Sequence, residues 1–202
     1  MSNAGPRIEP LVAPYEDGVG ERLARMMPTP EYEPIALFRT MVKNRPMAEA
    51  AWSLGAYGLG RRLSLDNRLR EIVIDRTSAR LGCEYEWSVH VFFFAPLVGF
   101  TAEQVTSLTH GSSADPCWDV RRERLTIDAV DALVDTGDIG DSLWADLAEV
   151  FTEVELLDLL TMTGWYHAIC FLARATRLPL EPGCPTFASV RAAASGEARQ
   201  AR

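Results

Sequence analysis

The stretch RLREIVIDRTSARLGCEYEWSVH, residues 68–90, decides the fold, because it holds two helical patterns joined at one glycine. Asp66 or Ser64 suits the N-cap of the first helix, since a short side-chain oxygen can accept hydrogen bonds from unpaired first-turn amides. Gly82 supplies the left-handed conformation common just beyond a helix end. A second helix follows over about residues 84–95, so the stretch predicts two consecutive helices that meet at a tight corner.

The sequence from residue 31 onward is helical nearly throughout and shows no sustained strand-like alternation. Thr101 with Gln104, and Thr152 with Glu155, match the capping box, in which the two side chains satisfy each other's free backbone amides. We therefore predict an all-α protein. The expected helices cover about residues 34–44, 46–58, 66–82, 84–95, 101–110, 118–134, 141–150 and 152–176.

Composition places the chain among globular proteins. Of 202 residues, 48% are hydrophobic and 24% are charged, close to the average for soluble domains. The longest unbroken apolar run is residues 91–98, less than half of the roughly 20 residues that a spanning helix needs. No apolar stretch follows a basic cluster near the N-terminus, so we expect neither a membrane partner nor a secretory signal.

The net charge indicates which partners the protein is unsuited to bind, and the cysteines indicate in which cellular compartment it works. The formal net charge of −8 opposes the basic surfaces that neutralise phosphate groups, so we expect no nucleic-acid partner. The four cysteines, at positions 83, 117, 170 and 184, include no CxxC pair. Free thiols in a reducing compartment are the simplest interpretation, which predicts a cytoplasmic protein.

The length fits one domain. We place it at residues 31–182, where the helical pattern is continuous. Residues 1–30 mix proline, glycine and acidic residues without periodicity, which predicts a loose N-terminal arm, and residues 183–202 are expected to form a C-terminal tail.

Helical periodicity gathers ionisable side chains on two faces. Glu71 lies on a face of the first helix where it is the only expected charge. On the second helix, Cys83, Glu86 and His90 follow spacings of three and four residues, so a thiol, a carboxylate and an imidazole share one face. Such a set suits proton transfer near neutral pH. From periodicity alone, an inert buried thiol, a core histidine and a glutamate paired with Arg68 remain open alternatives.

These residues resemble the signature region of the carboxymuconolactone decarboxylase family, which includes the alkylhydroperoxidase D-like proteins. Redox-active members have a glutamate, twelve residues later a Cys-x-x-Cys, and a histidine four residues after the second cysteine. Glu71, Cys83 and His90 match this spacing, and Glu86 stands at the position of the second cysteine. The looser resemblance covers residues 35–182 and implies an alkylhydroperoxidase D-like helical bundle.

The resemblance implies two branches of chemistry. In the redox branch the paired thiols form a disulfide, so Glu86 removes that mechanism and leaves a single-cysteine peroxidase on Cys83 as an alternative. The decarboxylase branch uses no metal or organic cofactor. There Glu71, Glu86 and His90 would transfer protons on a small carboxylated, lactone-like substrate, and this is our leading hypothesis. A non-catalytic oligomeric binding protein on the same fold is a further alternative.

The remaining expectations concern the substrate and the assembly. The expected partner is a small-molecule acid, and no metal site is expected. The apolar segment 152–176 and the run at residues 92–94 exceed what one small bundle easily buries, which predicts a homo-oligomer. The related families favour trimers and hexamers, and a dimer is an alternative. The candidate residues that surround the substrate are Tyr85, Trp87 and His167, with Trp52 and Tyr57 as further aromatic walls and Arg70, Arg76 and Arg80 as candidate anion ligands.

Overall fold

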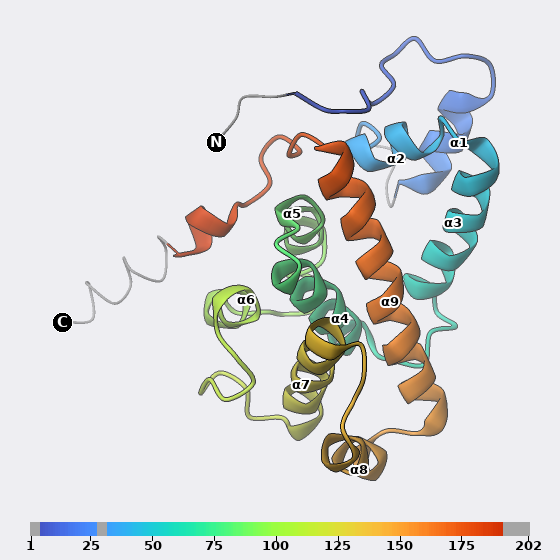
Figure 1. The fold of residues 1–202 in the computed structure, drawn as a ribbon. Helices are drawn as coiled ribbons and strands as arrows, with labels where there is room; N and C mark the ends of the chain where they lie inside the picture. The colour runs from blue at the N-terminus through green and yellow to red at the C-terminus, as the bar shows by residue number, and fades with distance from the viewer. Residues whose placement is uncertain (1–4, 28–31, 192–202) are drawn as a thin grey trace.

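The computed structural model describes residues 5–27 and 32–191, which contain helices and no strand (Figure 1). The all-α prediction is therefore confirmed for this part of the chain. The helices are α1 (Val19–Met26), α2 (Ala36–Met41), α3 (Arg45–Gly58), α4 (Asn67–Arg80), α5 (Glu84–Phe93), α6 (Ala102–His110), α7 (Arg121–Thr136), α8 (Asp141–Val150) and α9 (Glu153–Thr176).

Helix α4 is the centre of the bundle, where it packs against α5, α6, α7 and α9 (Figure 1). Its positions from Leu69 to Ser78 are buried all round the axis, and Ile72, Val73 and Ile74 are fully buried. A helix buried on every side is expected to be apolar, yet α4 also carries charged residues into the core. Those charges build the site described below.

The predicted caps form in the structure, although α2 begins at Ala36 and α7 at Arg121, two and three residues after the expected starts. The Asp66 carboxylate accepts a hydrogen bond from the Leu69 amide at 2.8 Å, and both predicted capping boxes are present. Gly82 has a φ of +63°, a backbone conformation that side chains other than glycine's rarely adopt. The Cys83 amide then donates to the Ser78 carbonyl at 2.8 Å, which closes the corner between α4 and α5.

The N-terminal segment differs from the loose arm that the sequence predicts. Val19, Leu23 and Met26 of α1 are buried in the core, because this short helix presents an apolar face to α2. The Arg7 amide also donates to the carbonyl of Thr176 at the end of α9, at 2.7 Å. Residues 5–27 therefore pack with the domain, whereas residues 1–4 and 28–31 lie outside the described structure.

The described part of the C-terminal segment, residues 183–191, packs against α5. The Phe187 ring lies 4.8 Å from the Trp87 ring, between centroids, and the Phe187 amide donates to the Glu84 carboxylate at 2.7 Å. These contacts tie part of the expected tail, residues 183–191, to α5. Residues 192–202, the rest of that tail, lie outside the described structure.

Helix α9 has a buried side and an exposed apolar side. By length and composition it alone among the described helices could cross a membrane, but half of that apolar window is buried, as in the core helix of a globular protein. Val154, Leu157 and Phe171 are exposed. The expected homo-oligomer remains a prediction.

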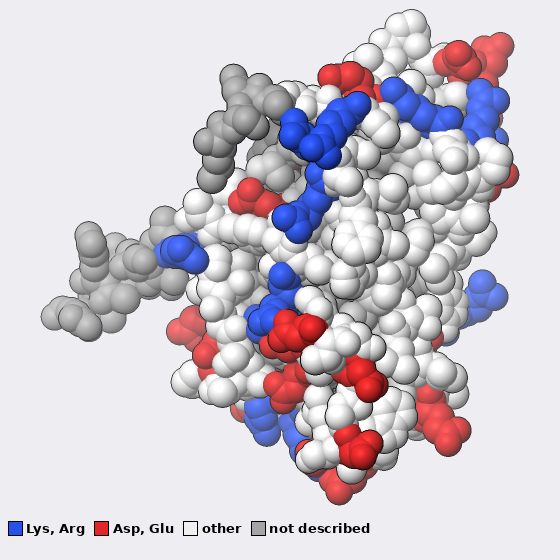
Figure 2. Space-filling model, in the orientation of Figure 1, with Lys and Arg blue, Asp and Glu red and all other residues white. Residues whose placement is uncertain are grey.

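On the face shown in Figure 2, basic and acidic side chains both occur and neither sign covers the surface.

Candidate acid–base site

The site centres on His90 of α5, which lies between two carboxylates. Its Nδ1 is 2.8 Å from Oε2 of Glu71 on α4, and its Nε2 is 3.5 Å from Oε1 of Glu86, one turn earlier on α5. All three side chains are almost completely buried. The helical corner at Gly82 therefore brings together the three residues that the spacing suggested.

Arg70 completes the charge pattern behind the histidine. Its Nε donates to Glu71 Oε1 at 2.7 Å, so each carboxylate oxygen of Glu71 has a partner. A buried charge needs this kind of compensation, because leaving water costs several kcal/mol per ion. Arg76 and Arg80 point elsewhere and form ion pairs with Asp131 and Asp135 respectively. Of the three candidate arginines, only Arg70 thus belongs to the site.

The two carboxylates control the protonation of His90. Burial by itself lowers the pKa of an imidazole, because it penalises the charged form. Here the attraction and hydrogen bond of Glu71, with a smaller contribution from Glu86, outweigh burial and raise the pKa of His90 to about 10. The side chain is therefore an imidazolium at neutral pH, with Nδ1–H donating to Glu71 and Nε2–H facing Glu86.

Asp75 is a member of this cluster that the sequence reasoning missed. It lies one turn after Glu71 on α4 and is only 1% exposed, and neither carboxylate oxygen has a hydrogen-bond partner in the described structure. Burial, followed by the negative charge of Glu71, raises the pKa of Asp75 well above its usual range. The expectation that Glu71 is the only charge on its face was wrong, and the i, i+4 spacing was the available signal.

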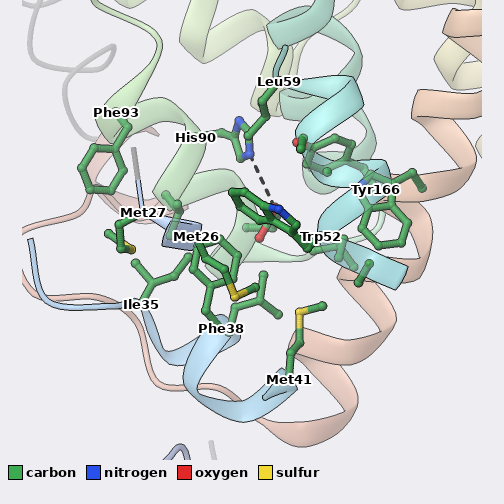
Figure 3. A pocket seen from close by; sticks show the side chains of 18 of the residues that line it. Met26, Met27, Ile35, Phe38, Met41, Trp52, Leu59, His90, Phe93 and Tyr166 are labelled. Carbon is green, nitrogen blue, oxygen red and sulfur yellow. Dashed lines mark ion pairs between the residues drawn. The ribbon is translucent and has the colours of Figure 1, made fainter. Parts of the chain in front are cut away.

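Glu86 and His90 open onto a cavity of about 400 Å³ between α1, α2, α3, α5 and α9 (Figure 3). Figure 3 shows His90 toward one end of this hollow and Phe38 and Met41 toward the other. Glu86 and His90 are the ionisable acid and base of a lining that is otherwise almost entirely apolar or aromatic. Its other residues are Met26, Met27, Ile35, Leu37, Phe38, Met41, Ala51, Trp52, Gly55, Ala56, Leu59, Val89, Phe93, Phe94, Trp165, Tyr166 and Ile169.

Three expected substrate-binding residues do not line this cavity. The Tyr85 hydroxyl donates to Glu181 at 2.6 Å and accepts from the Leu37 amide at 2.9 Å, so it ties α5 to α2 and the C-terminal segment. Trp87 is fully buried against Phe187, and His167 packs edge-on against Phe171, with ring centroids 4.8 Å apart.

The aromatic walls come from other positions. Of the two further candidates, Trp52 lines the cavity, whereas Tyr57 hydrogen-bonds to Asp158. Tyr166 stands next to the expected His167 but faces the site, with its ring centroid 5.2 Å from that of His90. Tyr166 and the expected His167 are consecutive residues of α9, and consecutive side chains on a helix point about 100° apart. Periodicity alone did not fix which of the two faces inward.

Cys83 is fully buried and does not line the cavity. Its Sγ lies 3.9 Å from the carbonyl oxygen of Cys170 on α9, 87 residues away in sequence. The close approach of the Cys170 side chain lowers the pKa of the Cys83 thiol, and the same approach together with burial raises the pKa of Cys170. The structure thus separates the thiol from the carboxylate–imidazole set that shares its helix face.

The described residues contain no group of three or more His, Cys, Asp and Glu side chains placed to hold a metal ion. Glu71, Glu86 and His90 are instead engaged with one another and with Arg70. Their arrangement holds a charged imidazole between two carboxylates at the wall of an apolar hollow.

These observations define an alkylhydroperoxidase D-like helical fold with a buried acid–base cluster. A peroxidase-related protein from Silicibacter sp. TM1040 superposes with a TM-score of 0.74 at 16% identity, over 90% of this chain and 96% of that chain. A candidate antioxidant defence protein, AhpD, from Agrobacterium tumefaciens has a TM-score of 0.59 at 22% identity, over 69% of this chain and 96% of that chain.

The debrominase Bmp8 is a further similar structure, with a TM-score of 0.69 at 16% identity, over 92% of this chain and 94% of that chain. No family model matches the sequence, and no curated protein matches it. At these identities the likeness concerns the fold alone, and the function has to be argued from the site.

Proposed function

We propose that this protein is a cofactor-independent enzyme that uses His90 and Glu86 for proton transfer to a small molecule bound in the apolar cavity. The observation that carries the proposal is the position of these two side chains, which bring an acid and a base to the wall of an otherwise apolar hollow. General acid–base catalysis of this kind contributes typically about 10²–10⁴-fold to a rate.

Decarboxylation is the reaction that we favour for this site. Loss of carbon dioxide leaves the electron pair of the broken carbon–carbon bond on the substrate as an enolate. The His90 imidazolium then donates the Nε2 proton to that carbon and becomes neutral. Glu86, 3.5 Å from Nε2, is placed to return a proton from solvent. An apolar hollow helps, because it desolvates a carboxylate whose charge becomes dispersed as the bond breaks.

Glu71, Arg70 and Asp75 act on this reaction through His90. Glu71 holds the Nδ1 side and maintains the positive charge, and Arg70 fixes Glu71. Asp75, as a protonated acid, adds no further negative charge beside the two glutamates. The fold neighbour Bmp8 was also crystallised, with one cysteine replaced by alanine, in complex with 2,3,4-tribromopyrrole. A small ring as ligand of a related fold is compatible with a small cyclic substrate in this cavity.

The test is turnover of a panel of small carboxylated lactones and cyclic keto acids in deuterated water. We expect release of carbon dioxide and one deuterium at the carbon that lost it. His90→Ala and Glu86→Gln should lower the rate by about 10²–10⁴-fold, whereas Cys83→Ser should leave it within about twofold. Unchanged turnover in His90→Ala would overturn the proposal.

A thiol peroxidase is the second candidate, and the lowered pKa of Cys83 beside Cys170 favours it. Its difficulty is access, because Cys83 is fully buried and does not line the cavity. Peroxide consumption that requires a thiol reductant and disappears in Cys83→Ser would establish this function. Binding without turnover by either route would leave the third candidate, a non-catalytic binding protein.

A further inference from the structure

A second hollow adjoins the cavity and shares two of its lining residues. It measures about 320 Å³ and is lined by Arg22, Arg25, Met26, Ala48, Glu49, Trp52 and Ser53. Met26 and Trp52 line both spaces, so they form the boundary between an apolar interior and a charged rim. A ligand longer than the cavity would therefore pass Trp52 and reach the rim.

The rim carries a cation with a weak partner. Arg22 is engaged, because its guanidinium donates to Glu49 at 2.8 Å. Arg25 has only a looser ion pair with Glu21 at 3.7 Å, and its side chain is 76% exposed. A guanidinium offers five N–H donors in a fixed fork that matches a carboxylate or phosphate. Arg25 is therefore placed to receive an anionic group without breaking a close ion pair.

The cavity itself is unsuited to a permanent anion. Its described lining contains no lysine or arginine, and the His90 imidazolium is already compensated by the carboxylates of Glu71 and Glu86. The second oxygen of Glu86 is buried without a hydrogen-bond partner. An anionic group held there would face Glu86 in a low-dielectric space, where like charges repel strongly. The rim is the favourable place for a charge that the ligand keeps.

We propose that the ligands of this site are amphipathic acids, with the apolar body in the cavity, the reacting end at His90, and a retained carboxylate at Arg25. This inference rests on the proposed function, because it assumes that the cavity is the substrate site. Three methionines, Met26, Met27 and Met41, line the hollow, and such flexible side chains adapt to different ligand shapes. The selectivity for charge then resides at the rim.

The test compares decanoate with decanol by isothermal titration calorimetry, since the two probes share a chain and differ in the charged group. Arg25→Glu should weaken decanoate binding about threefold to tenfold at low salt, the size expected for losing and reversing one exposed ion pair. Decanol binding should stay within about twofold. Added salt should weaken decanoate binding in the wild type and leave decanol unaffected. Arg45→Glu, on α3 outside both hollows, is the matched control.

The outcomes separate this inference from the proposed function. If both probes bind and Arg25→Glu changes neither, or changes both equally, the rim does not select the anion and the inference falls, while the cavity stands as a binding site. If neither probe binds the wild-type protein, the inference and the assumption about the cavity both fail. Arg25 is exposed, so its variant is expected to fold, and an unchanged thermal melt checks this.

Discussion

Glu71 Oε2 and His90 Nδ1 meet at 2.8 Å although the two residues belong to different helices and stand 19 positions apart. This contact joins α4 to α5 inside the core and fixes the orientation of the imidazole. The other ring nitrogen is left to face Glu86 and the cavity. The same contact therefore helps to hold the two helices together and orients the imidazole toward the cavity.

The first prediction concerns the charge of His90. Replacing Glu71 with glutamine keeps the shape but removes the negative charge that contributes most to raising the pKa of His90. The pKa of His90 should fall from about 10 toward or below the ordinary value. Titration of the histidine side chains by NMR measures this, with His110 and His167 as internal references. An unchanged midpoint for His90 in Glu71→Gln would show that the contact does not set its charge.

The second prediction is the pH dependence of stability. The pKa of His90 is about 10 in the folded state, compared with about 6.5 in an unfolded chain. The stabilisation by its protonation is therefore complete below about pH 6.5 and lost as the pH rises through about 10. The free energy of unfolding, from urea titrations, should fall over this window. His90→Gln should show a shallower fall, and equal slopes in the two proteins would contradict the assignment.

Asp75 should also make the free energy of unfolding fall as the pH rises. An acid whose pKa is raised by folding holds its proton more tightly in the native state, so it also makes stability fall as pH rises above its unfolded pKa. Comparing Asp75→Asn with His90→Gln in the same urea titrations separates the two contributions. If Asp75→Asn leaves the pH dependence unchanged at every pH above about 4, Asp75 is not the neutral acid described here.

The third prediction concerns thiol accessibility. Cys83 and Cys170 are fully buried, whereas Cys117 and Cys184 are partly exposed. A thiol-specific reagent such as DTNB should modify about two thiols per chain in the folded protein and the remaining two only after unfolding. Cys83→Ser should leave the number of fast-reacting thiols unchanged, and Cys184→Ser should reduce it by one. Rapid modification of Cys83 would instead support the peroxidase alternative.

The fourth prediction fills the cavity. Gly55 lies inside α3 at the cavity wall, and a Cβ atom added there meets no atom within 4 Å. Gly55→Leu should place a side chain in the hollow and weaken decanol and decanoate binding at least tenfold. Helix propensity should meanwhile raise stability by about 0.5–1 kcal/mol.

Gly164 provides the matched control, because it lies inside α9, is exposed, and also has no atom within 4 Å of an added Cβ. Gly164→Leu should bring a similar gain in helix propensity without changing ligand affinity. Calorimetry of both variants measures the difference. Ligand binding by Gly55→Leu as tight as by Gly164→Leu would mean that the probes bind elsewhere.

Local signals allowed most of the fold to be predicted. Capping residues such as Asp66 and Thr152 and the corner at Gly82 act within a few residues, so the sequence reports them directly. Helical spacing predicted that Glu86 and His90 share one face of α5, and the family resemblance added Glu71, which contacts His90 from α4 in the structure. These features need no knowledge of distant contacts.

What escaped prediction depends on long-range packing. The neighbourhood of Cys83 and Cys170 joins segments 87 residues apart, and no spacing rule links them. The inward rotation of Tyr166, in place of His167, follows from how α9 lies on α4 and α5. Asp75 is a different case, because its spacing one turn after Glu71 could be seen in the sequence, and only its complete burial depends on how the other helices pack around α4.

Helix α1 has a practical consequence for anyone who shortens this protein. The boundary suggested by composition, residue 31, would leave Glu71, Glu86 and His90 untouched but would delete Met26 and Met27, which belong to the cavity wall. It would also remove Arg25 from the rim. A protein trimmed there would keep its acid–base residues but would open the cavity beside Glu86 and His90 to water. Loss of activity in such a shortened protein would then be explained by the missing part of the cavity wall. It would not show that the catalytic residues were wrongly assigned.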